Sequence, residues 1–279
     1  MSRIRGVPVT RIVHSPVPGA TYPAAVTTEE PPEELVRLAS ADNFRDVAGP
    51  GYPTGDGGTV RRGVLFRANE LRLTHEDAAS IAALGVTSVL DLRSRHEIDA
   101  HPDLEIPGAT WTHVDVLGIP MEEIASLPSR AAAVAMMERV YRGFVEDPAT
   151  RAALGRVLTH LAGDGVHLFH CSAGKDRTGW TAALLLHLAG VADDVIEADY
   201  LLTNAYAEAS RAAVLEQIVA HLGPDKAAVY EPVLAADADY LRTSYDAIAS
   251  AYGDRATYLR SGLGLGDDVL AALRSRLRG

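Results

Sequence analysis

Residues 170–179 read His-Cys-Ser-Ala-Gly-Lys-Asp-Arg-Thr-Gly and lie between two largely apolar runs, 166–169 and 180–188. The first run has the length of a buried strand, and the second is long enough to belong to a helix. Cys171, the single cysteine among 279 residues, comes at the junction between them. The stretch therefore predicts a strand, a tight turn that carries a thiol, and a helix whose N-terminus faces that turn.

Five residues separate Cys171 from Arg177, a spacing that lets the turn curl around one tetrahedral phosphoryl group. The backbone N–H groups between them and the N-terminus of the following helix would bind its oxygens. The same positive potential favours the thiolate form of Cys171, which makes it a nucleophile. Arg177 offers two parallel N–H donors to a phosphate, a geometry that lysine lacks. Within this turn we expect substrate to contact Ser172, Ala173, Gly174, Lys175 and Thr178.

Other interpretations of the turn compete with anion binding. A lone cysteine is most often a small buried apolar side chain, but Arg177 at this spacing argues against that reading. A Walker-type nucleotide loop fits poorly, because the lysine is followed by Asp176 rather than by Ser or Thr. A metal site is disfavoured as well, since His167 and His170 are three residues apart on a strand and face opposite sides.

A carboxylic acid near the turn would protonate the leaving oxygen of a phosphate ester. Asp176 lies inside the turn, close to any bound ester. Asp91 lies near the end of a predicted parallel strand, and the carboxyl ends of such strands meet at one edge of a sheet. Either aspartate could instead orient Arg177 by a salt bridge. Asp115 has a similar place and reads more simply as a solvated carboxylate. Thr178 could cap the helix or assist the breakdown of a phosphocysteine.

The pattern His-Cys-x-x-Gly-Lys-x-Arg-Thr-Gly resembles the signature of the cysteine-dependent protein tyrosine and dual-specificity phosphatase superfamily. With Asp after Lys, it is similar to the bacterial tyrosine/dual-specificity and phosphoinositide phosphatases, mycobacterial enzymes among them. The resemblance runs from about residue 35 to the C-terminus, because further motifs of that family occur in order. These motifs are residues 43–46, 65–68, 91–94 with Glu97, 199–204, and 258–260 with 262–264.

The resemblance implies an α/β phosphatase fold and metal-independent hydrolysis of phosphotyrosine in proteins through a phosphocysteine intermediate, without a cofactor. In this branch it also implies activity on phosphoserine or phosphothreonine and on phosphoinositides, and Lys175 suits a multiply phosphorylated headgroup. It favours Asp176 as the acid, ahead of Asp91. A phosphoinositide phosphatase is therefore the alternative enzyme. A non-catalytic module that binds phosphate groups and a sulfur transferase are the alternatives from other classes.

Outside this turn, predicted strands and helices alternate, which favours a mainly parallel central sheet flanked by helices. Strands are predicted at residues 64–67, 86–92, 110–116 and 166–169. Thr74 should be the N-cap of a helix that stops at Gly85. Residues 121–162 and most of the chain after Asp194 read as helices, with a break at Gly223-Pro224.

We expect residues 1–34 to form an extended N-terminal lead-in and residues 35–279 to form a single phosphatase domain. Within it, residues 121–160 are a candidate helical lid over the pocket, as the resemblance suggests. The large apolar side chains of this part favour the core instead, because they recur at helical spacing. They are Met136, Met137, Val140, Tyr141 and Phe144.

The net charge of −11 argues against a nucleic-acid partner. A single cysteine forms no internal disulfide, so the fold does not depend on an oxidising compartment. No apolar run reaches the roughly 18 residues of a membrane helix, and the N-terminus has no classical signal peptide. We therefore expect phosphorylated proteins or phosphoinositides as partners, no stable membrane insertion, and a location in the cytoplasm or, after export by another route, outside the cell.

Overall fold

The computed structural model describes residues 38–278, so the proposed lead-in, 1–34, lies outside the described residues. Within 38–278, five strands form one sheet in the order β1-β2-β5-β3-β4. They are β1 (Arg45–Asp46), β2 (Leu65–Ala68), β3 (Val86–Asp91), β4 (Thr110–His113) and β5 (Val166–His170). Strand β1 pairs antiparallel with β2, and every other pairing is parallel. The predicted mainly parallel α/β architecture is confirmed.

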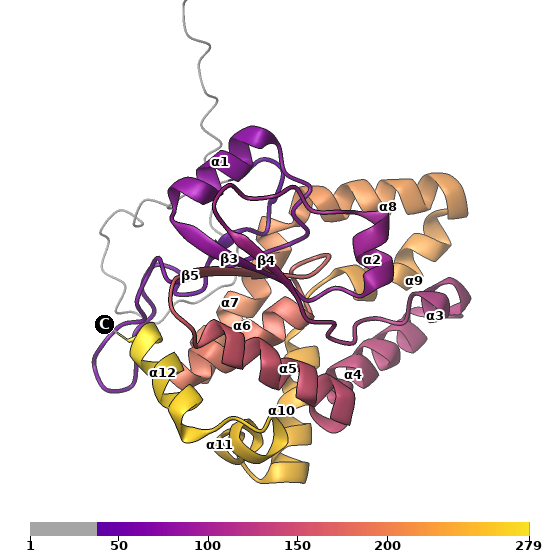
Figure 1. Ribbon diagram of the computed structural model, residues 1–279. Coiled ribbons are helices and arrows are strands. Elements are labelled where there is room, and N and C mark those ends of the chain that lie inside the picture. The colour runs from indigo at the N-terminus through magenta and orange to yellow at the C-terminus, as the bar shows by residue number, and fades with distance from the viewer. Residues whose placement is uncertain (1–37, 279) are drawn as a thin grey trace, which may run out of the picture. The chain divides into compact units, whose positions relative to one another are not determined.

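Helices occupy most of the remaining described chain (Figure 1). They are α1 (His75–Ala83), α2 (Arg95–Ala100), α3 (Met121–Ser126), α4 (Arg130–Glu146), α5 (Pro148–Leu161), α6 (Arg177–Ala189), α7 (Asp193–Tyr206), α8 (Glu208–Leu222), α9 (Pro224–Leu234), α10 (Ala238–Tyr252), α11 (Arg255–Thr257), the π-helix η1 (Tyr258–Gly262) and α12 (Asp267–Leu277). None of these helices in residues 38–278 has both the length and the apolar character needed to span a membrane.

Alternating residues of the central strands enter two separate hydrophobic cores. Phe66, Val89 and Leu168 pack in the core that α1 covers. Leu65, Leu90 and Phe169 pack in the larger core on the opposite face, to which α4, α5, α6, α10 and α12 contribute. Figure 1 shows α1 on one side of the sheet and α5, α6 and α12 on the other. The period-two pattern of the strands thus yields a sheet that is buried on both faces.

Local signals in the sequence place several helix ends correctly. The Thr74 hydroxyl accepts a hydrogen bond from the N–H of Asp77 and caps α1. Gly85 follows that helix with a φ of +80°, a conformation that favours glycine. Helices α8 and α9 meet at Gly223, as expected. The strand predicted at 110–116 is shorter, because its last residues leave the ladder after His113.

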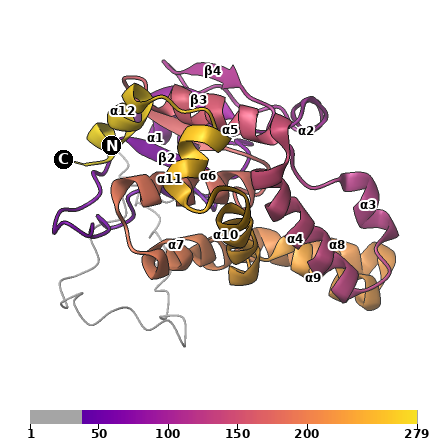
Figure 2. The same cartoon turned by 90° about the horizontal axis from the view of Figure 1, so that it is seen from below.

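The candidate lid, 121–160, comprises α3, α4 and most of α5. In α4 the side chains of Met136, Met137, Tyr141 and Phe144 are buried. This helix packs against α9 and α10, and Figure 2 shows α4, α8, α9 and α10 gathered on the side of the molecule away from β4. The apolar stripe therefore belongs to the core, and the lid stays a prediction for the rest of this segment.

Two helical glycines provide a matched test of the packing between α5 and the segment after η1. A Cβ on Gly155 would lie 2.3 Å from the carbonyl oxygen of Leu263, whereas one on Gly143 would meet nothing within 4 Å. We expect Gly155→Ala to lower the free energy of unfolding by about 1–3 kcal/mol through overpacking. Gly143→Ala, the control, should raise it by about 0.5–1 kcal/mol. Urea denaturation measures both; equal effects would contradict the close approach.

Candidate active site

Cys171 directly follows β5, and Arg177 is the first residue of α6. Strand β5 lies between β2 and β3, so the turn from Cys171 to Arg177 sits at the carboxyl edge of the sheet, near its centre. The Cys171 side chain is a free thiol and is buried. The predicted succession of strand, turn and helix is confirmed.

The carbonyl groups of this turn are bound by donors from distant parts of the chain. The pairs are Ser172 O with the N–H of Glu70, Ala173 O with the Asn43 amide, and Gly174 O with the Arg67 guanidinium, each at 2.9 Å. By contrast, the backbone N–H groups of residues 172–176 donate no hydrogen bond to any residue within 38–278. The turn therefore keeps its acceptors occupied and its donors available, which is the arrangement that an anion requires.

Gly174 is the residue of the turn whose type is dictated by space and backbone conformation. Its φ is +67°, in the left-handed region. A Cβ at this position would lie 2.5 Å from the Ala68 carbonyl oxygen and 2.7 Å from the Asn43 amide nitrogen. A side chain here would displace the same groups that hold the turn, so glycine is required.

Buried charged groups from β1, β2 and α7 brace the turn from behind. Arg67 of β2 donates to the Asp199 carboxylate of α7 at 2.9 Å as well as to Gly174 O. Arg45 of β1 contacts Asp199 at 3.5 Å and donates to the Thr203 hydroxyl at 3.2 Å. These side chains connect the antiparallel edge of the sheet directly with α7, and Arg67 also connects it with the turn.

Arg177 pairs with Glu97 through two parallel hydrogen bonds, of 2.8 Å and 2.6 Å. The Ser172 hydroxyl donates to the same carboxylate. Burial works against the charged form of both groups, but the pairing outweighs it. As a result, the pKa of Glu97 lies well below its ordinary value and the pKa of Arg177 lies above its own. Arg177 is thus held as a cation in a set orientation.

Glu97 has a second role at the start of α2. It is the third helical residue after the N-cap Ser94, and the two form a reciprocal capping box. The capping box fixes the carboxylate at the helix N-terminus, from which it reaches Arg177. Sequence reasoning quoted Glu97 as part of a family motif and assigned it no role in the site; the spacing Ser-x-x-Glu was the signal that could have located it.

Asp176 is held by one oxygen. Its Oδ1 accepts hydrogen bonds from the Tyr141 hydroxyl and from Lys175 Nζ, both at 2.8 Å, and its Oδ2 accepts none from a described residue. Tyr141 also pairs with the Tyr200 hydroxyl at 2.7 Å, and burial keeps the pKa of both tyrosines well above the ordinary value. Lys175 is buried and donates to the Ala235 carbonyl at 3.1 Å, so its ammonium is not freely solvated.

Thr178 is the second residue of α6 and is fully buried. The N-cap of this helix is Asp176, so the alternative in which Thr178 caps the helix is wrong. Its hydroxyl has no hydrogen-bond partner among the described residues. A buried hydroxyl without a partner, one residue after Arg177, is available to a group bound in the turn.

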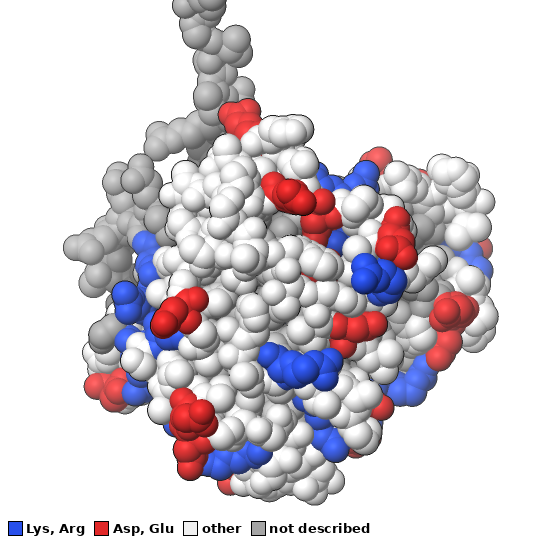
Figure 3. Space-filling model, viewed as in Figure 1, with Lys and Arg blue, Asp and Glu red and all other residues white. Residues whose placement is uncertain are grey.

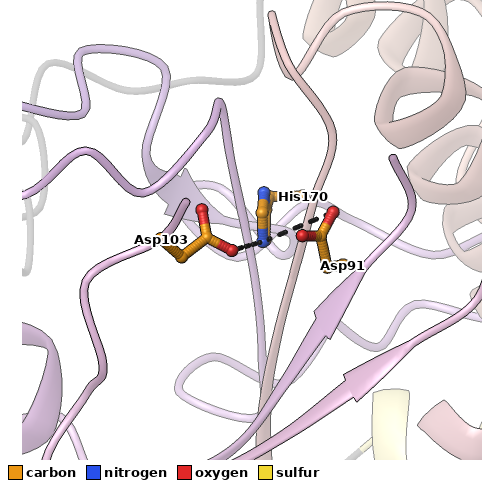
Figure 4. A group of neighbouring side chains, drawn as sticks. All are labelled: Asp91, Asp103 and His170. Carbon is orange, nitrogen blue, oxygen red and sulfur yellow. Dashed lines mark ion pairs between the residues drawn. The ribbon is translucent and has the colours of Figure 1, made fainter. Parts of the chain in front are cut away.

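Asp91 ends β3 but points into a buried ion-pair network (Figure 4). The carboxylate is fully buried and receives three hydrogen bonds from Nε and Nη2 of Arg93, the shortest at 2.8 Å. His170 lies between Asp91 and Asp103, with Nε2 at 3.9 Å and 3.1 Å from their oxygens. The carboxylate thus supports the residue that precedes Cys171 and makes no hydrogen bond to Arg177.

Asp91, Asp103 and His170 lie close enough together to suggest metal ligands. However, the guanidinium of Arg93 is 2.8 Å from both carboxylates. A cation therefore already occupies the position between them, and a metal ion would have to displace it. The donor set fits an ion-pair network better than a metal centre.

The segment that follows β4 packs against the guanidinium of Arg177. A Cβ on Gly118 would lie 2.9 Å from the central guanidinium carbon of Arg177, so glycine permits this close contact. Asp115, in the same segment, is exposed and makes no hydrogen bond or ion pair within the described chain. Leu117 exposes 62% of its surface beside this contact. These residues form the rim of the site.

Residues 36–279 match the tyrosine phosphatase family. This match covers the sheet, the thiol-bearing turn and the helices around it. The chain belongs to the tyrosine phosphatase family. It is therefore a phosphatase, and phosphorylated proteins are its class of substrate.

Individual relatives of this phosphatase agree with the family match. It is 34% identical over 282 residues to the triple specificity protein phosphatase PtpB of Mycobacterium tuberculosis, which covers 87% of this chain and 97% of that protein. It is 33% identical over 258 residues to a putative tyrosine-protein phosphatase of Cupriavidus necator, with 90% of each chain covered. A tyrosine-protein phosphatase of Nostoc commune is 29% identical over 210 residues, which cover 68% of this chain and 70% of that protein.

The positive charge at the site is buried rather than displayed on the surface. Figure 3 shows acidic and basic side chains interspersed on the face in view. The basic groups around the turn, namely Arg45, Arg67, Lys175 and Arg177, are all buried. In a phosphatase with a net charge of −11, the basic groups next to the turn are therefore shielded from bulk solvent.

Replacement of Glu97 by glutamine tests the pairing with Arg177. A carboxylate whose pKa is depressed by folding adds stability above its unfolded pKa and loses it as the pH falls. We expect Glu97→Gln to be less stable than the wild type at neutral pH. The difference in unfolding free energy should shrink from about pH 5 toward about pH 3, because protonation removes the wild-type advantage.

Urea denaturation at a series of pH values measures this difference. Glu123→Gln is the control, because Glu123 forms an exposed ion pair with Arg139, and such pairs add little stability at any pH. A deficit of Glu97→Gln that stays constant across the acid range would show that the charge of Glu97 does not matter.

Proposed function

We propose that the phosphatase hydrolyses phosphotyrosine in proteins through a phosphocysteine intermediate on Cys171. The observation that carries this proposal is the turn itself. It starts at the only cysteine, its N–H groups donate to no described residue, and it ends at Arg177, which Glu97 orients. Arg177 and the N–H groups bind the phosphoryl oxygens, and this binding favours the transition state as charge builds up on them. The proposal treats residues 35–279 as a single phosphatase domain.

The reaction has two steps. In the first, Cys171 Sγ bonds to phosphorus, the bond from phosphorus to the ester oxygen breaks, and that oxygen takes a proton from an acid. In the second, water attacks the phosphocysteine, the same carboxylate takes a proton from the water, and the S–P bond breaks to release phosphate and the thiolate. Neither step needs a metal ion or an oxidant, since the protons and electrons balance within the site.

Asp176 is the acid that the geometry supports. Its Oδ1 is held by Tyr141 and Lys175, which leaves Oδ2 for the leaving oxygen. Asp91 is enclosed by Arg93, so its role is to support the strand end rather than to donate a proton. Asp115 is exposed at the rim, where no contact orients it.

The substrate class extends beyond phosphotyrosine in this proposal. The M. tuberculosis relative bears the name of a triple specificity phosphatase, which supports activity on phosphoserine or phosphothreonine as well. Phosphoinositides are the alternative substrates. The Lys175 ammonium is less available to bind a phosphoinositide headgroup, because it already donates to Asp176 and to the Ala235 carbonyl.

Cys171→Ser should abolish turnover while binding is retained. Serine at this position keeps the shape of the turn but is a far weaker nucleophile at neutral pH. We expect no release of phosphate from a phosphotyrosine peptide, together with peptide binding that calorimetry still detects. Arg177→Ala should lose both binding and rate, the rate by roughly 10²–10³-fold. Turnover by Cys171→Ser at the wild-type rate would rule out the phosphocysteine route.

Asp176→Asn should slow substrates with poor leaving groups most. General acid catalysis contributes about 10²–10⁴-fold where the leaving oxygen is basic and little where it is already stable as an anion. We therefore expect a large loss on a phosphoserine peptide and a small loss on a nitrophenyl phosphate. Asp115→Asn is the matched control and should change neither rate. Equal slowing of both substrates by Asp176→Asn would assign that residue a purely structural role.

A further inference from the structure

The charged groups in and around the turn that starts at Cys171 come from several elements. They are Arg177 and Asp176 at the start of α6, Lys175 in the turn, Glu97 of α2, Arg67 of β2, and His170 of β5 with its partners Asp91 and Asp103. Two of the cations are paired one to one, Arg177 with Glu97 and Lys175 with Asp176. Each carboxylate offsets part of the charge of its partner, although Arg177 still interacts electrostatically with Cys171.

Arg45, Arg67 and Asp199 form a further buried group next to the turn, and in this group the cations outnumber the carboxylates. Arg45 and Arg67 share one carboxylate, that of Asp199, at 3.5 Å and 2.9 Å. Each of these three side chains is buried, with at most 7% of its residue exposed. The Tyr52 hydroxyl that donates to Asp199 is neutral, since burial raises its pKa. Two guanidinium groups and one carboxylate leave a net charge of one on this side.

Arg67 is the member of this group that contacts the turn. Its two terminal nitrogens donate to Asp199 and to Gly174 O, both at 2.9 Å, while its Nε has no partner among the described residues. Burial and the charge of Arg45 lower the pKa of Arg67 to about 10, while Asp199 and the Cys171 thiolate act in the opposite direction. Arg67 thus remains a cation at neutral pH and interacts electrostatically with Cys171.

We propose that Arg67 is a positioning residue for Cys171. Its guanidinium holds the Gly174 carbonyl away from the bound phosphoryl group, and its excess charge favours the thiolate. Asp199 orients Arg67 and limits that charge. This inference rests on the proposed role of Cys171 as the nucleophile and adds a second guanidinium to the site.

The planar fork of arginine accounts for the residue type. One nitrogen reaches the Asp199 carboxylate while the other reaches the Gly174 carbonyl, and both bonds keep a fixed geometry. A lysine would supply the charge but no fork. The tether and the charge can therefore be separated by substitution.

The experiment follows the pH dependence of Cys171 alkylation by iodoacetamide in the full-length protein, with inhibition by inorganic phosphate as a second readout. Arg67→Met should move the half-reaction pH upward by about one unit, because a nearby cation is lost. Asp199→Asn should move it downward by about one unit, because a nearby anion is lost. Arg67→Lys should keep the wild-type profile and bind phosphate about tenfold more weakly, since the tether to Gly174 is gone.

Arg255→Met is the control, because Arg255 pairs with Asp193 and lies against the ring of Tyr245. It should change neither readout. A purely structural role for Arg67 and Asp199 predicts shifts in the same direction, and such a result, or a wild-type profile in Arg67→Met, would overturn the inference. If Arg67→Met does not fold, the other two variants decide the question. An upward shift of the half-reaction pH in Asp199→Asn, or a shifted profile in Arg67→Lys, would then overturn the inference.

These outcomes are distinct from a failure of the proposed function. Alkylation reports the ionisation of the thiol without any turnover. Full turnover by Cys171→Ser would contradict the phosphocysteine mechanism. An unchanged alkylation profile in Arg67→Met would contradict only the proposed role of Arg67.

Discussion

A turn that binds phosphate must keep a run of backbone N–H groups free, although unpaired buried N–H groups cost free energy. In this phosphatase the N–H groups of residues 172–176 donate to no residue within 38–278. The carbonyl groups of Ser172, Ala173 and Gly174, in contrast, all accept hydrogen bonds from donors elsewhere in the chain. Each tether holds one peptide unit in its orientation. The antiparallel edge of the sheet and the residues after β2 matter because they carry those donors.

The proposed phosphate site has to work in a chain of net charge −11. Bare buried cations would be expensive, so each cation near the turn has a carboxylate within hydrogen-bond distance. Pairing reduces the charge of each cation but fixes its direction. In the proposed mechanism, phosphate is then attracted by oriented N–H donors and by the excess positive charge of the two arginines beside Asp199. Such a site acts at short range, which favours recognition of the phosphoryl group itself over recognition of charge around it.

The sequence revealed the parts of the site that are local. The order of strand, turn and helix, the cap at Thr74 and the stop at Gly85 all depend on residues within a few positions of one another. The partners of the turn are of another kind: Tyr141, Glu97 and Arg67 lie 35, 80 and 107 positions from the residues that they contact. No periodicity connects such positions. Only the packing of α2, α4 and β2 around the turn brings them together.

Asp91 illustrates how a sound rule leads to a different role. The carboxyl ends of parallel strands do meet near the active site, and Asp91 does end β3 beside β5. Two residues later, however, Arg93 returns its guanidinium to the same carboxylate. Because Arg93 binds both oxygens of that carboxylate, Asp91 supports His170 and the strand end. Asp176 lacks such an enclosure at Oδ2, and a free oxygen inside the turn is what proton transfer to an ester needs.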